Sequence, residues 1–208
     1  MLVVLRPRSL KQAHCQLDLL QAMGLLHVEL AVEASQAWSQ SSIRLAAAFP
    51  ALRLGAASVT ALEQLEAVAA AGLAYAVSPI LDSELLHRAR QLGLTLVPGV
   101  QSPTEVHQAQ RLGCGIVKLF PARMLGSGYW ASLAGPLGPL PFCIAAGGLA
   151  CADVLPWLEQ GVNAVALGGR LFAPHLDRSG QAEGPGGLDP QLAVLVQHFA
   201  GLAHQRLH

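Results

Sequence analysis

One pattern recurs along the chain: a helical stretch ends at a glycine, and a short apolar run follows at once. Two examples are AVAAAGLAYAVS at 67–78 and RARQLGLTLVPG at 88–99. Glycine accepts the left-handed conformation that closes the last turn of a helix. The pattern therefore predicts that helices end, and strands follow, at five positions: Gly24, Gly72, Gly93, Gly113 and Gly161.

Several helix starts are also marked. Ser102-Pro103-Thr104-Glu105 forms a capping box with proline at the first helical position. Hydroxyl and carboxylate side chains satisfy free backbone N–H groups at helix starts, so we expect further N-caps at Ser9, Thr60 and Asp82.

The apolar runs are continuous rather than alternating, which is typical of strands buried on both faces of a parallel sheet. Eight such runs are spaced roughly 23 residues apart, the length of a minimal βα unit. Their carboxyl ends lie near Arg6, Glu29, Ser58, Ser78, Pro98, Lys118, Gly147 and Gly168. Eight even units predict an α/β protein, a single-domain (β/α)8 TIM barrel over residues 1–208. An open doubly wound sheet uses the same units and is the alternative.

Near the end of the chain, the stretch 178–187 is rich in glycine and polar residues. It predicts a flexible surface loop before a last helix at roughly 190–205. We find no domain boundary.

The composition is 52% hydrophobic and 12% charged, so much of the chain must be buried. Thirteen basic and thirteen acidic residues balance, which argues against nucleic acid or a membrane surface as a partner. No apolar run is long enough to span a bilayer, and the basic residues follow the first apolar run, the reverse of a signal peptide. The four cysteines lack the spacing of a metal site, and we interpret them as reduced core thiols of a cytoplasmic protein. They are Cys15, Cys114, Cys143 and Cys151.

Lys118 is the strongest chemical signal, because it stands inside the apolar strand GIVKLFPA and is one of only two lysines. Burial lowers the pKa of a lysine, and a neutral amine can attack a ketone to form an imine. The alternatives are a lysine that reaches the surface at a strand end and one that pairs with a core carboxylate.

Glu29, in LLHVELAV, is a second polar residue in a buried strand. A buried carboxyl near a lysine can serve as a general acid and base, although a purely structural Glu–Lys pair is the alternative. His27 shares the same strand face, and we interpret it as a core histidine rather than a metal ligand. No second cluster of histidine and carboxylate follows another strand, so no metal site is predicted.

Three further features stand where a barrel carries its active site, at the carboxyl ends of the strands. Arg6 follows the first strand and suits a carboxylate or phosphate, or else is simply solvated. The glycine pairs after strands seven and eight leave backbone N–H groups open to a phosphate, although sharp turns also use such pairs. These pairs are Gly147-Gly148 and Gly168-Gly169.

Taken together, these segments resemble the bacterial 2-keto-3-deoxy-6-phosphogluconate (KDPG) and 4-hydroxy-2-oxoglutarate (KHG) aldolases over residues 2–173. VKLFPA around Lys118 is similar to the imine-lysine motif of that family, and HVEL around Glu29 to its catalytic-glutamate strand. Five shorter segments match in order and spacing: VLR ending at residue 6, GAASV at 55–59, SP at 78–79, PGV at 98–100 and AGG at 146–148.

The resemblance implies a homotrimeric barrel without metal or cofactor that cleaves a small 2-keto acid. It implies Lys118 as the imine-forming nucleophile, Glu29 as the proton shuttle, Arg6 as a carboxylate clamp and Phe120 as a pocket wall. By the same resemblance, the other expected substrate contacts are Ser58, Pro98, Gly147, Gly148, Gly168 and Gly169.

The chain departs from the family pattern in four places, the first of them a pair of residues. Ala57-Ser58 replaces Gly-Thr, Ala146 replaces a threonine, Gly169 replaces a serine that binds phosphate, and Glu33 stands where threonine or arginine is usual. Arg170 or Arg123 could balance the Glu33 charge. KDPG is the first substrate we expect. The alternatives are the same imine chemistry on 4-hydroxy-2-oxoglutarate or oxaloacetate, and a catalytically weak barrel that binds a phosphate ligand.

Overall fold

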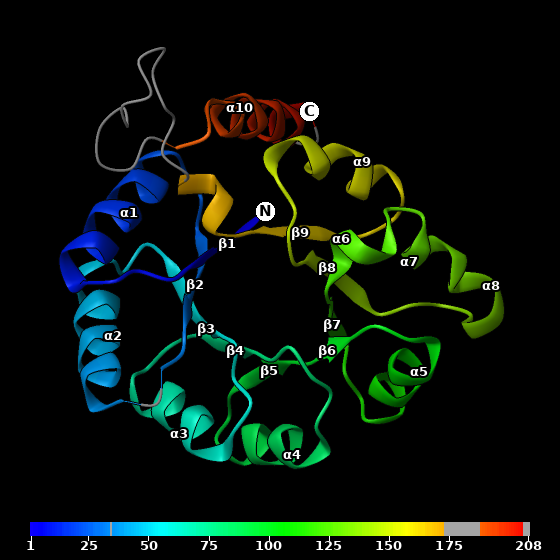
Figure 1. The fold of residues 1–208 in the computed structure, drawn as a ribbon, viewed down its shortest axis with the longest axis horizontal. Coiled ribbons are helices and arrows are strands. Elements are labelled where there is room, and N and C mark those ends of the chain that lie inside the picture. The colour runs from blue at the N-terminus through cyan, green and yellow to red at the C-terminus, as the bar shows by residue number, and fades with distance from the viewer. Residues whose placement is uncertain (34, 173–187, 206–208) are drawn as a thin grey trace.

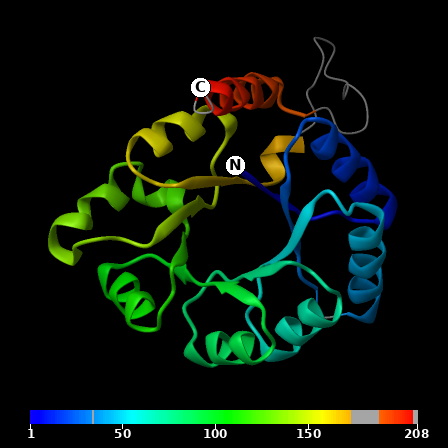
Figure 2. The same cartoon turned by 180° about the vertical axis from the view of Figure 1, so that it is seen from behind.

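The computed structural model describes residues 1–33, 35–172 and 188–205. Strands form a nearly closed ring with helices around its outside, seen from opposite ends in Figures 1 and 2. All paired strands are parallel. They are β1 (Leu2–Leu5), β2 (His27–Ala31), β3 (Arg53–Ala57), β4 (Tyr75–Val77), β5 (Thr95–Val97), β6 (Gly99–Val100), β7 (Ile116–Leu119), β8 (Phe142–Ala146) and β9 (Ala164–Leu167).

The strand order is β5-β4-β3-β2-β1-β9-β8-β7-β6, so the two edge strands are consecutive in the chain. Pro98 separates them, and the pair β5–β6 corresponds to one predicted strand. Because Pro98 has no N–H group, it interrupts the ladder at this point. The two edges of the sheet thus adjoin at Pro98, and the strands form a nearly closed barrel. This arrangement confirms the predicted (β/α)8 barrel rather than the open sheet.

The principal helices alternate with the strands, as the glycine pattern predicts. They are α1 (Leu10–Ala22), α2 (Gln36–Ala48), α3 (Leu62–Ala70), α4 (Ser83–Gln91), α5 (Pro103–Arg111), α9 (Val154–Glu159) and α10 (Pro190–Gln205). Between β7 and β8 lie the short helices α6 (Ala122–Leu125), α7 (Tyr129–Ser132) and α8 (Ala134–Leu137). Two 3-10 turns, η1 (Cys151–Asp153) and η2 (Gly169–Phe172), complete the set. The last helix, α10, lies on the outside beside α9 (Figure 1).

The boundary signals are confirmed with one exception. All five predicted helix-stop glycines have φ between 66° and 92°. The side chains of Ser9, Asp82 and Ser102 accept backbone N–H groups at the starts of α1, α4 and α5. The predicted cap at Thr60 is wrong, since α3 begins one residue later than that cap requires, with Ala61 at the N-cap. The Gln64 side chain accepts the N–H groups of Thr60 and Ala61 instead.

Apolar side chains pack in two places. The larger cluster fills the space between the sheet and the helices. A smaller cluster fills the inside of the barrel and consists of Leu2, Val77, Val97, Ile144, Ala146, Ala164 and Ala166, with Val4 and Tyr75 against it. Glu29 and Lys118 belong to the few buried polar residues, at 1% and 8% exposure. Burying two ionisable groups costs free energy that an apolar pair would avoid, which points to a chemical role.

Two burial predictions are wrong. His27 is exposed, because it opens β2 at the amino end of the strand, where the barrel rim meets solvent. Cys15 is also exposed and Cys114 is half-buried, whereas Cys143 and Cys151 are buried as expected, and all four thiols are free. The stretch 178–187 lies outside the described residues. Among the helices described, none is both long and apolar enough to cross a membrane.

Candidate active site

Strand register places Glu29 and Lys118 inside the barrel. Glu29 of β2 pairs with Val4 of β1 and Gly55 of β3. Lys118 of β7 pairs with Gly99 of β6 and Ile144 of β8. Val4 and Ile144 belong to the apolar cluster inside the barrel, and side chains at paired positions share one face of a sheet. The two ionisable residues therefore project from different strands into one interior space. Glu29 stands two residues before the end of β2, deeper than the predicted strand end.

The Lys118 amine lies against the ring of Phe120, with Nζ 4.7 Å from the ring centroid. Burial lowers the pKa of this amine, Glu29 raises it in part, and the positive charge of Arg6 lowers it further. The net effect favours the neutral form, which has the free electron pair a nucleophile needs. The backbone is held as well, since the Lys118 N–H donates to the Pro98 carbonyl at 2.8 Å.

The Glu29 carboxyl has its pKa raised to about 7. Burial is the main cause, and the neighbouring Lys118 charge opposes it. The two groups are within electrostatic reach, yet their charged atoms make no ion pair within 4.0 Å in the described part of the chain. A carboxyl that is near half-protonated at neutral pH can both give and accept a proton. Such a group beside an amine whose pKa is lowered suits a proton shuttle.

Arg6 and Ser58 meet at the barrel mouth. Arg6 follows β1 and Ser58 follows β3, and the Arg6 Nη2 donates to Ser58 Oγ at 3.3 Å. Ser58 has φ of 67°, a left-handed conformation that non-glycine residues rarely adopt. The structure thus joins two residues that were predicted separately from the sequence.

The glycine pair after β8 is a close-packed turn. Gly147 and Gly148 have φ of 102° and 79°. A Cβ at Gly147 would lie 2.9 Å from two ring atoms of Phe120, so this glycine lets the ring pack beside Lys118. The Arg123 side chain binds this turn: its Nη1 donates to the Gly148 carbonyl at 3.1 Å. The same nitrogen lies 3.8 Å from Asp153 Oδ2.

The second glycine pair, Gly168-Gly169, has free space on its side-chain side among the described residues. At the end of β9, none of the described residues beyond the chain neighbours has an atom within 4 Å of an ideal Cβ at Gly168 or Gly169. The Gly168 carbonyl accepts the N–H of Leu171, which closes the short turn η2. Arg170 in this turn is exposed. A ligand group could reach the backbone here.

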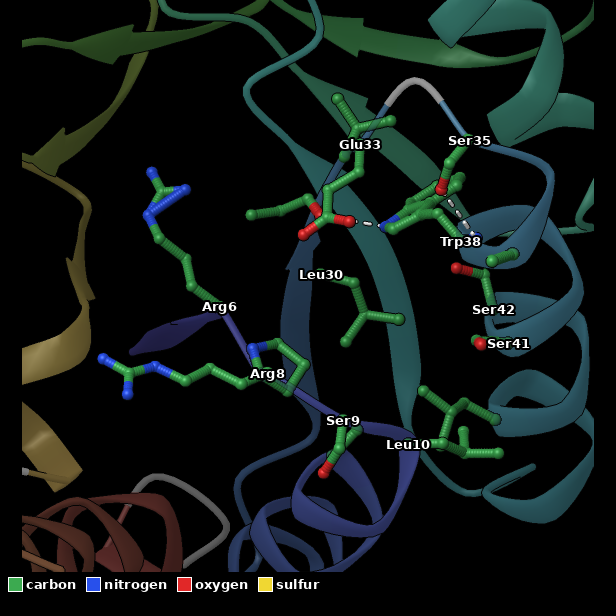
Figure 3. Close-up of a pocket in the computed structure, with 16 residues that line it drawn as sticks. Arg6, Arg8, Ser9, Leu10, Leu30, Glu33, Ser35, Trp38, Ser41 and Ser42 are labelled. Atoms are coloured by element: carbon green, nitrogen blue, oxygen red, sulfur yellow. Dashed lines mark hydrogen bonds between the residues drawn. The ribbon is translucent and has the colours of Figure 1, made fainter.

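A cavity of about 400 Å³ opens beside the barrel mouth, between the segments that follow β1 and β2. Figure 3 shows Arg6 and Arg8 on one side of it and Glu33 on another. Hydroxyl groups of Ser9, Ser35 and Ser41 also line it. Glu33 makes no ion pair within 4.0 Å among the described residues. The cations that share its cavity are thus Arg6 and Arg8, rather than Arg123 or Arg170.

Two features escaped the sequence reasoning. Arg8 and Ser9 line the cavity from the β1–α1 connection, and only their position after a predicted strand marks them in the sequence. Tyr75 lies inside the barrel near Glu29, and its place in the buried strand LAYAVS was the available signal.

Comparisons with known proteins identify the family of the chain. A family model described as KDPG and KHG aldolase matches residues 1–181. The chain belongs to this aldolase family. It is therefore an aldolase, a carbon–carbon lyase.

Individual relatives within the family carry two substrate names. The chain is 31% identical over 160 residues to 2-dehydro-3-deoxy-6-phosphogalactonate aldolase of Escherichia coli K12, covering 76% of this chain and 75% of that protein. It is 31% identical over 169 residues to 2-dehydro-3-deoxy-phosphogluconate aldolase of Pseudomonas aeruginosa, covering 80% and 76%. A solved structure described as native KDPGal superposes with a TM-score of 0.77 at 26% identity, covering 99% of this chain and 95% of that one.

Proposed function

We propose that this aldolase cleaves KDPG to pyruvate and glyceraldehyde 3-phosphate through an imine on Lys118. One observation carries the proposal: a buried amine biased toward its neutral form shares the barrel interior with a carboxyl whose pKa is about 7. Perturbed pKa values on neighbouring buried groups of this kind are typical of catalytic sites.

The first half of the reaction forms the imine. The neutral Lys118 amine attacks the C2 ketone of the substrate, and a carbinolamine results. Glu29, in its protonated form, donates a proton to the departing hydroxyl, and water leaves. The protonated imine then withdraws electrons from the adjacent carbons.

The second half breaks the C3–C4 bond. Glu29, now ionised, accepts the proton of the C4 hydroxyl, the C3–C4 electron pair moves toward the imine, and the aldehyde is released. Protonation of the remaining enamine at C3 and hydrolysis of the imine release pyruvate and restore Lys118. Each proton that Glu29 accepts is later returned, so the cycle closes.

The other residues hold the substrate in this proposal. Arg6 binds the C1 carboxylate, Ser58 and Pro98 border the keto acid, and Phe120 forms the pocket wall. The backbone N–H groups of Gly147 and Gly148 approach the keto acid from the other side. The phosphate lies against Gly168 and Gly169, where the backbone is open.

A second candidate is the C4 epimer, 2-keto-3-deoxy-6-phosphogalactonate. The observation that favours it is the similarity to the Escherichia coli enzyme named for that substrate, at 31% identity over three quarters of both chains. Imine formation and proton transfer are the same for both epimers. The epimers differ in the configuration at C4, so their C4 hydroxyls point in different directions relative to Glu29.

A third candidate, cleavage of 4-hydroxy-2-oxoglutarate, uses the same residues without a phosphate site. The KHG aldolases share the family model, and Gly169 offers no side-chain hydroxyl to a phosphate. Cytoplasmic location and a homotrimer complete the proposal as expectations.

The deciding experiment is borohydride trapping with pyruvate, followed by peptide mass spectrometry. We expect one reduced pyruvyl adduct, on Lys118. The chain offers a matched control in its other lysine, Lys11, which is exposed at the start of α1. Lys118→Ala should remove both the adduct and lyase activity, whereas Lys11→Ala should keep both. No adduct at saturating pyruvate would refute the imine.

The substrate is then identified by pyruvate release from purified protein. KDPG, its C4 epimer, their unphosphorylated analogues and 4-hydroxy-2-oxoglutarate are compared by kcat/KM. A large preference for KDPG over both its epimer and its unphosphorylated analogue supports the first candidate. Equal values with and without the phosphate would refute the phosphate contact at Gly168 and Gly169.

A further inference from the structure

The hydroxyl of Tyr75 stands out inside the barrel. Tyr75 opens β4 and packs against the interior apolar cluster. Its hydroxyl oxygen is buried and makes no hydrogen bond with the described residues. Buried polar groups are nearly always paired, so a phenol placed here needs an explanation.

Strand register brings this phenol to Glu29. Glu29 pairs with Gly55, and Gly55 pairs with Tyr75 on the next strand. A Cβ at Gly55 would lie only 2.5 Å from Cε2 and 2.6 Å from Cζ of Tyr75. The outer end of the ring, which carries the hydroxyl, therefore occupies the side-chain space of Gly55, directly beside Glu29. The missing side chain at Gly55 is what allows the phenol to reach this position.

The surroundings of the phenol favour its protonated form, which can donate a hydrogen bond. Glu29 raises the pKa of Tyr75, in addition to a larger effect of burial, and Arg53 lowers it in part. The phenol thus keeps its proton across the working pH range. Other titratable groups near this region are Lys118 from β7, Arg6 from the end of β1 and His27 from the start of β2, and the Met1 amine acts on His27 in turn.

Resting on the proposed role of Glu29, we propose that Tyr75 is a positioning residue whose hydroxyl donates a hydrogen bond to the ionised Glu29 carboxylate. The bond forms directly or through one water molecule when Glu29 has given up its proton. A neutral donor stabilises the ionised carboxylate without adding a charge that would compete with Lys118. Tyr75 keeps its own proton throughout and sets how readily Glu29 accepts one from the C4 hydroxyl.

The test is Tyr75→Phe, which keeps the ring and removes only the hydroxyl. Without the donor, the pKa of Glu29 rises further, so the acid limb of the kcat profile, which reports the ionised Glu29 of the imine complex, should move up by about one pH unit. At pH 6 kcat should fall about tenfold, with KM little changed. Thermal stability should be kept at pH 5, where Glu29 is mostly protonated and the hydroxyl has no partner to lose.

The chain supplies a matched control in its only other tyrosine. Tyr129, in α7, donates its hydroxyl to the Gln101 carbonyl at 2.7 Å, outside the barrel interior. Tyr129→Phe should leave the acid limb in place. An unchanged acid limb in Tyr75→Phe, or an equal shift in both variants, would overturn the proposal.

A double-variant comparison separates this inference from the proposed function. In a Glu29→Gln background, Tyr75→Phe should cause no further loss in the rate of pyruvate trapping on Lys118, because the ionisable carboxylate whose pKa Tyr75 sets is already gone. If Tyr75→Phe lowers the trapping rate as much in this background as in the wild type, Tyr75 acts on a group other than Glu29, and the inference is overturned. If the wild type itself traps no pyruvate, the proposed function fails and this inference fails with it. If the wild type traps pyruvate normally but Tyr75→Phe leaves the pH profile unshifted, only the inference about Tyr75 is refuted.

Discussion

The Arg6 guanidinium donates to the Ser58 hydroxyl across the barrel mouth, with Nη2 and Oγ 3.3 Å apart. These residues are 52 positions apart in the chain, and the contact links the ends of β1 and β3. Ser58 holds the acceptor in place while adopting a φ of 67°. The contact thus orients the side chain that is proposed to bind the substrate carboxylate, at some cost in backbone strain.

Two substitutions at Ser58 separate strain from function. Ser58→Gly removes the hydroxyl and relieves the left-handed strain, so we expect stability to be unchanged or to rise by about 1 kcal/mol. Ser58→Ala removes the hydroxyl and keeps the strain, so it should not gain stability. Both variants should raise the KM for the keto acid several-fold, because Arg6 loses its acceptor. A KM unchanged in both would show that Ser58 does not orient Arg6.

Removing the Arg6 charge should change the pH dependence of imine formation. Arg6 contributes to the lowered pKa of Lys118. In Arg6→Ala the amine stays protonated to higher pH, so borohydride trapping at saturating pyruvate should slow at pH 6 and recover toward pH 9. The effect should be less than about tenfold, because solvent screens the exposed guanidinium. Arg8→Ala, from the same connection, should leave the pH dependence unaltered.

The Glu29 carboxyl should make the stability of the fold fall with rising pH. Burial raises its pKa in the folded protein to about 7 from the ordinary value of 4.5. Below pH 4.5 the group is protonated in both states, and above pH 7 the folded state bears the full cost of the buried charge. Between pH 5 and pH 8 the wild type should lose up to about 3 kcal/mol relative to Glu29→Gln.

Urea unfolding at each pH measures this difference. Glu159→Gln, at the exposed end of α9, is the control and should track the wild type. If the wild type and Glu29→Gln keep a constant difference from pH 5 to pH 8, the carboxyl does not titrate with a raised pKa.

The two glycine pairs should differ sharply in their tolerance of a methyl group. Gly147→Ala forces a Cβ to 2.9 Å from the Phe120 ring at a φ of 102°, so we expect a loss of about 2–4 kcal/mol in unfolding free energy. In the part of the chain that the structure describes, a Cβ at Gly168 meets no atom within 4 Å, so Gly168→Ala should cost less than about 1 kcal/mol. Calorimetric melting of both variants tests this. Similar losses at both sites would contradict the packing described here.

The carboxylate of Glu33 should weaken binding of phosphorylated substrates. It shares the cavity beside the barrel mouth with Arg6 and Arg8 and has no ion-pair partner within 4.0 Å among the described residues. Glu33→Thr removes a charge that repels an anionic substrate, so kcat/KM for KDPG should rise several-fold, more at low salt than at high salt. Glu84→Gln, exposed on α4, should have no such effect. A loss of activity in Glu33→Thr would instead give this carboxylate a role in turnover.

Local features of the sequence determined the elements of this fold. Gly72 and Gly93 end their helices with positive φ, and Ser102 and Asp82 begin theirs with side-chain hydrogen bonds, all as predicted. Such signals act within four residues, so they can be read without knowing the fold. The buried strands marked Lys118 and Glu29 for the same reason, since a charged residue in an apolar run is conspicuous by itself.

Only the tertiary structure decided which side chains meet. The phenol of Tyr75 lies beside Glu29 because three neighbouring strands align in one register and Gly55 leaves the space open. Arg123 belongs to the Gly148 turn rather than to Glu33. Contacts of this kind depend on how the strands stagger when the sheet closes into a barrel. That stagger is set by packing across the whole barrel, which no local run of residues specifies.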